Sequence, residues 1–293
     1  MNGHDPYPTR GASRPELIGR VDPVVHGNAA GPLSAGELVD FDRDGYLRMD
    51  RLISPEEVVL YAGELARLAG DPALRGDERV ITEKDSGEVR SVFDVHRISP
   101  VFAKLAADPR VAGRARQILG SDVYVHQSRV NYKPGFRGKD FYWHSDFETW
   151  HAEDGMPRMR AVSVSIALTP NDLCNGSLMI MPGSHRTFVS CAGETPEGHY
   201  RESLKDQEIG TPDPESLTAL ADEHGIELFT GEAGSAVMFD CNCMHGSNGN
   251  ISPYPRSNVF LVFNSVENAC GDPYAAPSRR PEFLASRDFT PVA

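Results

Sequence analysis

DVYVHQSRVNYK (residues 122–133) and MRAVSVSIALTP (residues 159–170) are two stretches in which side chains of different character alternate along the chain. Because successive side chains of a strand point to opposite faces, this period of two is typical of β-strands. Three further stretches between Gly, Pro, Asn and Asp turns share this character: SLMIMPGSH (177–185), SAVMFD (235–240) and RSNVFLVFNSV (256–266). We therefore expect a mainly β protein, an antiparallel sandwich or barrel with helices packed outside it.

Two amphipathic helices are expected before these strands. SPEEVVLYAGELARLAG (residues 54–70) starts with serine, has glutamate three residues later and continues with apolar side chains at helical spacing. This is the pattern of a capping box followed by a buried helix face. DPRVAGRARQILG repeats it, and we expect this second helix to be capped by Asp108 and to end at Gly120.

The remaining sequence suggests an arm, one domain and an insertion. Residues 1–33 are rich in Pro, Gly and small polar residues without periodicity, so we expect an N-terminal arm that carries no chemistry. Residues 34–293 are expected to form a single domain. A long polar and acidic insertion near 187–230 interrupts it and is predicted to contain one helix near 214–223. Loops of this length are often lids or binding segments.

The composition is that of a globular protein, since 40% of the 293 residues are hydrophobic and 24% are charged. A net charge of −13 without any run of Lys and Arg argues against nucleic acid as a partner. Five cysteines without a C-x-x-C pair indicate neither a disulfide framework nor a zinc cluster, and Cys241 and Cys243 are interpreted as packing residues. Because no secretory signal and no membrane-spanning apolar stretch of roughly 18 residues is visible, we expect a cytoplasmic protein without membrane contacts.

Three residues have the types and spacing of a metal site. His144 and Asp146 are two positions apart, so in an extended chain they point to the same side. His245 directly follows an apolar strand and can complete the set if that strand lies beside the first. Two imidazoles and one carboxylate leave coordination positions open, as in non-haem Fe(II) oxygenases. A single His-x-Asp also arises often by chance, so this pair alone does not decide the matter.

Arg256 strengthens the hypothesis, because it follows His245 by eleven residues at the start of a strand. In such oxygenases a cation at this position binds the distal carboxylate of 2-oxoglutarate, and a guanidinium offers that carboxylate a planar, permanently charged fork. The chemical alternative is a zinc hydrolase, since zinc also accepts His and Asp ligands. A hydrolase would leave Arg256 without a role and has no evident general base here.

A longer stretch, WHSDFETWHAEDGMPRMRAVSVSIALT (residues 143–169), closely resembles the signature of the ectoine hydroxylases. These enzymes form a group within the phytanoyl-CoA-dioxygenase-like branch of the Fe(II)/2-oxoglutarate oxygenases. The similarity continues less densely through FDVHRISPVF, QSRVNYKPG, LMIMPGSHRTF and CNCMHGSNGNISPYPRSNVFLVFN, and so covers most of residues 90–265. It implies a double-stranded β-helix, a cupin-like jelly roll with flanking helices. It also implies Fe(II), 2-oxoglutarate as cosubstrate, O₂, and conversion of L-ectoine to 5-hydroxyectoine in a homodimer.

The resemblance further implies a set of site residues. The catalytic metal ligands would be His144, Asp146 and His245. The residues at 2-oxoglutarate-binding positions are Lys133, Arg256 and Ser247. The residues at ectoine-binding positions are Gln127, Thr149, Trp150, Phe263 and Arg280.

The chemistry of ectoine agrees with these residue types. Ectoine is a small zwitterion with a cyclic amidinium and a carboxylate, so its pocket needs an aromatic face, an amide and a donor for the carboxylate. Gln127 and Lys133 share the parity of Val123 and Val125, so we expect all four on an inward face. The acidic residues after Trp150 are interpreted, together with His151, as a solvated turn.

Two alternatives stay open from the sequence. The same chemistry could act on another small amino-acid-like substrate, or the chain could be a non-catalytic jelly-roll protein that keeps the metal triad for structure. Iron-dependent release of succinate would separate an oxygenase from a binding protein.

Overall fold

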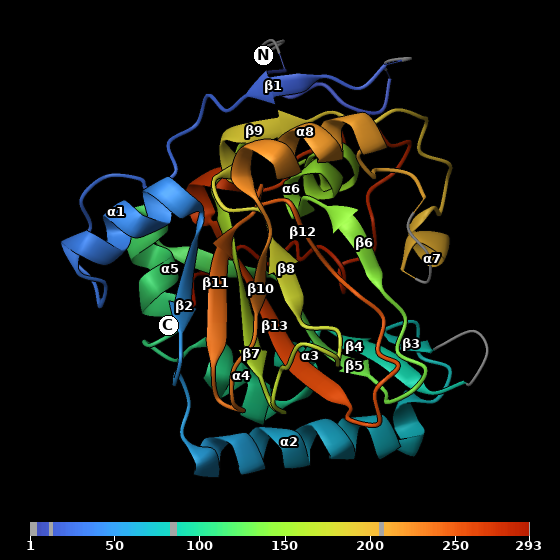
Figure 1. Cartoon of the computed structure of the whole chain (residues 1–293). Coiled ribbons are helices and arrows are strands. Elements are labelled where there is room, and N and C mark those ends of the chain that lie inside the picture. Colours follow the sequence, from blue (N-terminus) through green and yellow to red (C-terminus); the bar gives the residue numbers. More distant parts are fainter. Residues whose placement is uncertain (1–4, 12–13, 83–86, 205–207, 293) are drawn as a thin grey trace.

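Two antiparallel sheets face each other in the computed structural model, which describes residues 5–11, 14–82, 87–204 and 208–292 (Figure 1). The larger sheet has the order β2 (Tyr46–Met49), β11 (Ala236–Asp240), β7 (Ala161–Ala167), β13 (Arg256–Ser265), β5 (Val123–Lys133), β4 (Val89–Phe93) and β3 (Val80–Thr82). The smaller has the order β10 (Glu227–Phe229), β8 (Leu178–Ile180), β12 (His245–Ser247) and β6 (Phe141–His144). Apolar side chains of β8 and β10 pack against β11 between the sheets. This is the expected jelly roll.

Helices cover the outer face of the larger sheet. They are α1 (Ala35–Asp44), α2 (Pro55–Gly70), α3 (Val95–Ile98), α4 (Pro100–Ala106) and α5 (Ala112–Leu119), with the short turn η1 (Pro72–Leu74) after α2. Apolar residues of α2, α4 and α5 form one large core with the outward side chains of the central strands. Ser54 and Glu57 form the expected capping box of α2.

The second predicted helix begins later than expected. The structure starts α5 at Ala112, because residues 108–111 form a separate turn in which Asp108 Oδ1 accepts the backbone N–H of Arg110 at 2.8 Å. Gly120 ends the helix as expected, in the left-handed conformation.

A β-bulge in β5 decides which side chains face inward. The pairing with β13 shifts between Val262, which lies opposite Gln127, and Phe263, which lies opposite Val125, so His126 is the extra residue. A bulge reverses the alternation of side chains beyond it. Val123 and Val125 therefore belong to the outer core under the helices, whereas Gln127 faces the space between the sheets. The expectation that they share one face with Gln127 is wrong for this reason.

The remaining elements close the ends of the two sheets. They are the ribbon of β1 (Leu17–Gly19) and β9 (Thr187–Val189), the helix α6 (Asp146–Thr149) with the π-helical turn η2 (Trp150–Asp154), the helices α7 (Tyr200–Ser203) and α8 (Pro214–His224), and the short turns η3 (Ser184–Arg186) and η4 (Val266–Asn268). The helix predicted in the insertion is α8, with aspartate as its cap. None of the helices in the described part of the chain is long and apolar enough to cross a membrane.

Candidate active site

The three predicted metal ligands come together at one end of the smaller sheet. His144 ends β6, His245 begins β12, and the two are direct partners in the antiparallel pairing, with ring centroids 4.3 Å apart. Asp146 opens α6, two residues after His144. One possible ligand atom from each residue lies within 4.8 Å of the other two. Among the described residues this is the one group of His, Cys, Asp and Glu side chains with such geometry.

Hydrogen bonds orient all three ligands toward a common point. The Nδ1 atom of His144 lies 2.7 Å from the carbonyl oxygen of Tyr142, and Nδ1 of His245 lies 3.0 Å from that of Cys243. Each Nδ1–H therefore donates to a carbonyl and leaves Nε2 as the free ligand atom. Ser163 Oγ donates to Asp146 Oδ2 at 2.9 Å, so Oδ1 stays available, 3.8 and 3.9 Å from the two Nε2 atoms.

The electrostatics of this cluster suit a divalent cation. Burial, together with the nearby His144, lowers the pKa of His245 to about 4, so its imidazole is neutral at physiological pH. Burial acts to raise the pKa of Asp146, but His245, His144, the guanidinium of Arg129 and the hydrogen bond from Ser163 together outweigh it and hold that pKa below its usual range. Two imidazoles and one carboxylate with free ligand atoms fit an Fe(II) ion with open coordination positions.

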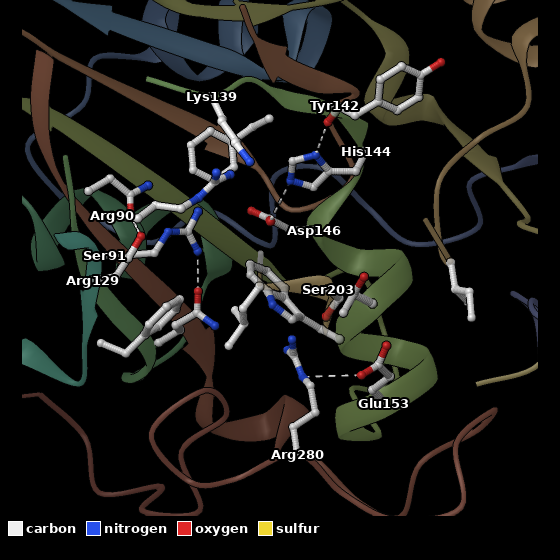
Figure 2. A pocket seen from close by; sticks show the side chains of 18 of the residues that line it. Arg90, Ser91, Arg129, Lys139, Tyr142, His144, Asp146, Glu153, Ser203 and Arg280 are labelled. Atoms are coloured by element: carbon white, nitrogen blue, oxygen red, sulfur yellow. Dashed lines mark hydrogen bonds and ion pairs between the residues drawn. The ribbon is translucent and has the colours of Figure 1, made fainter. Parts of the chain in front are cut away.

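A cavity of about 190 Å³ opens beside the ligands (Figure 2). Its wall contains the ligands His144 and Asp146, and Figure 2 shows them across the space from Arg280 and Glu153. Four of the five predicted ectoine-binding residues line it: Gln127, Thr149, Trp150 and Arg280. The insertion contributes Ser203, Leu204 and Ile209. The size suits a small metabolite and excludes a macromolecule.

The structure puts the fifth predicted residue, Phe263, elsewhere. Its side chain faces outward together with those of Val259 and Leu261 on the same uninterrupted strand, is fully buried in the core beneath the helices and does not line the cavity. The inward aromatic residue of this strand is Phe260, over whose ring the guanidinium of Arg129 lies at 4.7 Å. The residue that the resemblance assigns to ectoine at position 263 therefore lies on the outer face of this strand.

The predicted 2-oxoglutarate residues form a buried cationic group next to the cavity rather than in its wall. Lys133 and Arg256 are partners in the pairing of β5 with β13. The ammonium of Lys133 donates to Ser247 Oγ at 2.9 Å, and Arg256 donates to the carbonyl of Gly176. The Nε of Arg256 is buried without a hydrogen-bond partner, and burial lowers the pKa of this guanidinium to about 10.

Arg256 has an unbalanced charge. Within the described ranges of the chain, no carboxylate lies within 4 Å of it. A buried cation without an anionic partner is costly, so a carboxylate ligand would be strongly stabilised here.

Arg129 is a site residue that sequence analysis missed. It lines the cavity between Gln127 and Asn131, donates to the side-chain oxygen of Gln127, and burial lowers the pKa of its guanidinium. No ion pair with a carboxylate is found for it in the part of the chain that the structure describes. Its parity with Gln127 and Lys133 on β5 was the signal that could have identified it.

The residues after Trp150 are buried, so their interpretation as a solvated turn is wrong. His151, Glu153 and Asp154 are at most 3% exposed. Asp154 accepts two hydrogen bonds from Arg280, at 2.8 and 2.5 Å, which gives this carboxylate a long-range partner and removes the need for solvent. The rings of Trp150 and His126 form an edge-type contact, with centroids 5.1 Å apart.

Known proteins resemble this chain over almost its whole length. Residues 41–258 match the family "Phytanoyl-CoA dioxygenase (PhyH)". A protein of Streptomyces coelicolor named "Ectoine dioxygenase" is 65% identical over 99% of this chain and 98% of its own length. One of Streptomyces anulatus with the same name is 64% identical over 98% of this chain and 97% of its own length.

Solved structures agree with these relatives. EctD from S. alaskensis with 2-oxoglutarate and 5-hydroxyectoine has a TM-score of 0.88 and 49% identity, and the match covers 97% of this chain and 95% of that one. EctD from S. alaskensis with bound Fe has a TM-score of 0.87 and 47% identity, covering 99% and 100%. The resemblance found in residues 143–169 is thus confirmed, and the chain belongs to the phytanoyl-CoA dioxygenase family and, within it, to the ectoine dioxygenases.

Proposed function

We propose that this protein is an Fe(II)- and 2-oxoglutarate-dependent dioxygenase that hydroxylates L-ectoine to 5-hydroxyectoine and releases succinate and CO₂. The observation that carries this proposal is the convergence of three free ligand atoms at a small cavity, next to a buried arginine that no described carboxylate neutralises. The named relatives and the EctD structure with 2-oxoglutarate and 5-hydroxyectoine support the same reaction.

The metal ligands would be His144, Asp146 and His245, and the bound iron would supply the activation of O₂ that hydroxylation of a C–H bond requires. The backbone carbonyls behind the two imidazoles fix which nitrogen faces the ion. The carboxylate of Asp146 compensates part of the positive charge, which leaves room for an anionic cosubstrate.

The cosubstrate would be oriented by charge. Arg256 offers its guanidinium to the distal carboxylate of 2-oxoglutarate, and Lys133 and Ser247 form a hydrogen-bonded pair beside it. Arg129 lines the cavity and adds a further positive charge for a carboxylate. The buried position of these groups excludes water, which strengthens each interaction.

The substrate pocket would use Trp150 as a face for the amidinium, with Gln127 and Thr149 as polar contacts. Arg280 would meet the ectoine carboxylate while Asp154 holds the guanidinium in place. We further propose that residues 34–293 act as one catalytic domain preceded by the arm 1–33, that the protein is a homodimer, and that it works in the cytoplasm.

The test is reconstitution with Fe²⁺ and 2-oxoglutarate without oxygen, followed by O₂ and L-ectoine. We expect succinate and a product heavier by one oxygen atom in equal amounts by mass spectrometry. Succinate without hydroxyectoine would support the assignment as an oxygenase but contradict ectoine as the substrate, in favour of another small amino-acid-like molecule. Neither product from a folded, iron-loaded sample would favour the non-catalytic alternative.

Replacing Trp150 by Ala should raise the KM for ectoine about tenfold, since a desolvated cation–π contact contributes up to roughly 2 kcal/mol. The iron content should stay at the wild-type level, because Trp150 is not a ligand. Trp150→Phe, which keeps an aromatic face, is the matched control and should recover most of the loss. Equal losses of iron and of ectoine turnover in Trp150→Ala would mean that this residue only supports the core.

A further inference from the structure

Arg10 of the N-terminal arm has its guanidinium buried against the segment that forms the pocket. Its Nε and Nη2 donate to the two carboxylate oxygens of Glu148 at 2.9 and 2.8 Å, and Nη1 pairs with Glu153. Nη2 also lies 3.3 Å from Thr149 Oγ1. The guanidinium is fully buried in the structure. One side chain thus links both ends of the turn that carries Thr149 and Trp150.

The backbone of Arg10 is held in an unusual conformation. Its φ is 54°, in the left-handed region that residues other than glycine seldom adopt. Its N–H donates to the carbonyl of Cys191 at 2.8 Å, and the hydroxyl of Thr9 donates to Glu148 at 2.8 Å. Such strain persists only where surrounding contacts over-determine it. The contacts of the arm therefore hold this guanidinium in a defined position.

Arg10 is coupled to the cavity wall through charges. Glu153 lies between Arg10 and Arg280, with its second oxygen 4.0 Å from Nε of Arg280. Thr149, Glu153 and Arg280 all line the cavity, whereas Arg10 does not. Without Arg10, Glu148 and Glu153 would be buried anions lacking their main partner, and Glu153 would compete for Arg280.

The insertion packs directly against the ion pair of Arg10 and Glu148. Gly210 has a φ of +78°, and a Cβ added there would lie 2.3 Å from Nη2 of Arg10 and 2.8 Å from Glu148. The neighbouring Ile209 lines the cavity. Glycine at position 210 therefore lets the insertion pack against Arg10 and present Ile209 to the substrate space.

We propose that Arg10 is a positioning residue for ectoine: it fixes residues 146–154 and provides the surface on which the insertion packs. This rests on the proposed function for the identity of the substrate. The N-terminal arm is thus part of the binding apparatus, whereas its composition predicted an arm without chemistry. Arg10 acts through Glu148 and Glu153 and touches neither the substrate nor the metal ligands.

The test compares Arg10→Gln with Arg20→Gln in the full-length, iron-loaded enzyme. Arg20 is a matched control, because it also lies in the arm, is 3% exposed in its side chain and pairs with a buried carboxylate, Asp240, at 2.8 Å. It makes no contact with residues 146–154 in the hydrogen bonds of the described residues. Both changes should lower the melting temperature.

Only Arg10→Gln should raise the KM for ectoine, by about tenfold or more, as expected when charge-assisted hydrogen bonds are lost. The KM for 2-oxoglutarate should change less than about twofold, and more succinate should form per hydroxyectoine. Arg10→Lys, which keeps the charge but not the fork, should recover part of the loss. Gly210→Ala disturbs the same pair from the insertion and should raise the same KM.

Amide hydrogen exchange of the metal-free protein gives a readout that does not depend on turnover. Residues 146–154 should exchange faster in Arg10→Gln than in Arg20→Gln. If Arg10→Gln only lowers the melting temperature, with the KM for ectoine and the exchange of 146–154 as in Arg20→Gln, the proposal is overturned. If the wild type does not hydroxylate ectoine, the proposed function fails, and the exchange comparison still decides whether Arg10 positions this segment.

Discussion

Replacing Asp146 by Asn is expected to abolish both iron binding and turnover, with less than about 1% of the wild-type activity remaining. Loss of a residue behind a metal ligand typically costs 10- to 100-fold, and loss of a charged ligand should cost more. The amide keeps the shape of the side chain but removes the only negative charge of the triad. Three positive or neutral groups, His144, His245 and Arg129, would then surround the site. Iron content of the purified protein and succinate release are the measurements.

Asp154→Asn is the matched control for this experiment. Asp154 is a fully buried carboxylate of the same segment, but its partner is Arg280 and it is not near the ligands' common point. Its variant should bind iron normally and lose ectoine turnover through a displaced Arg280. Near-normal iron and activity in Asp146→Asn would refute the assignment of the triad. The same test applies to His144→Ala and His245→Ala.

The sequence predicted this cluster well because its signal is local. His144 and Asp146 are two positions apart, and a period of two identified the strands on either side. That His245 meets them depends on the pairing of β12 with β6, which no spacing reveals. The similarity of residues 143–169 to a known family supplied this long-range information.

The β-bulge, which a single extra residue creates, could not be predicted from such a local signal. The bulge at His126 has no clear signature in DVYVHQSRVNYK, yet it reverses the faces of β5, so that Val123 and Val125 face away from Gln127. Parity arguments assume an uninterrupted strand, so they fail beyond such a point.

Buried charges were missed because their partners are distant in sequence. Glu148 and Glu153 look like exposed acids in a polar run, and only the fold brings Arg10 from 138 and 143 residues upstream. Asp154 meets Arg280 from 126 residues downstream. Composition and periodicity describe neighbours along the chain, and an ion pair of this kind leaves no trace in either.

Replacing Arg256 by Met is expected to raise the KM for 2-oxoglutarate about 100-fold, which corresponds to about 3 kcal/mol of lost binding free energy. Arg256→Lys should lose about tenfold, because an ammonium cannot bind a carboxylate through two parallel hydrogen bonds. The KM for ectoine should change far less. Steady-state rates of succinate formation at varied 2-oxoglutarate provide the measurement.

Although Arg256→Met should weaken binding of 2-oxoglutarate, it should not destabilise the ligand-free protein. Burial lowers the pKa of Arg256 to about 10, below that of the exposed guanidinium in the unfolded chain, so folding disfavours the charged form. This destabilisation is present in full at every pH below about 10 and is relieved progressively as the pH rises from there toward the higher pKa of the unfolded chain. Methionine removes the unpaired charge and keeps most of the volume, so the melting temperature should stay equal or increase.

Arg280→Met is the control, because here we expect the melting temperature to fall. Arg280 is buried like Arg256 but is paired with Asp154, so its removal leaves an uncompensated carboxylate and should lower the melting temperature. The KM for 2-oxoglutarate should not change in this variant. A fall in melting temperature for Arg256→Met with an unchanged KM for 2-oxoglutarate would mean that Arg256 serves only to hold the carbonyl of Gly176. Under the proposed function, the carboxylate of 2-oxoglutarate would supply the negative charge that no described residue places within 4 Å of Arg256, which is a reason to retain a buried cation that lowers the stability of the ligand-free fold.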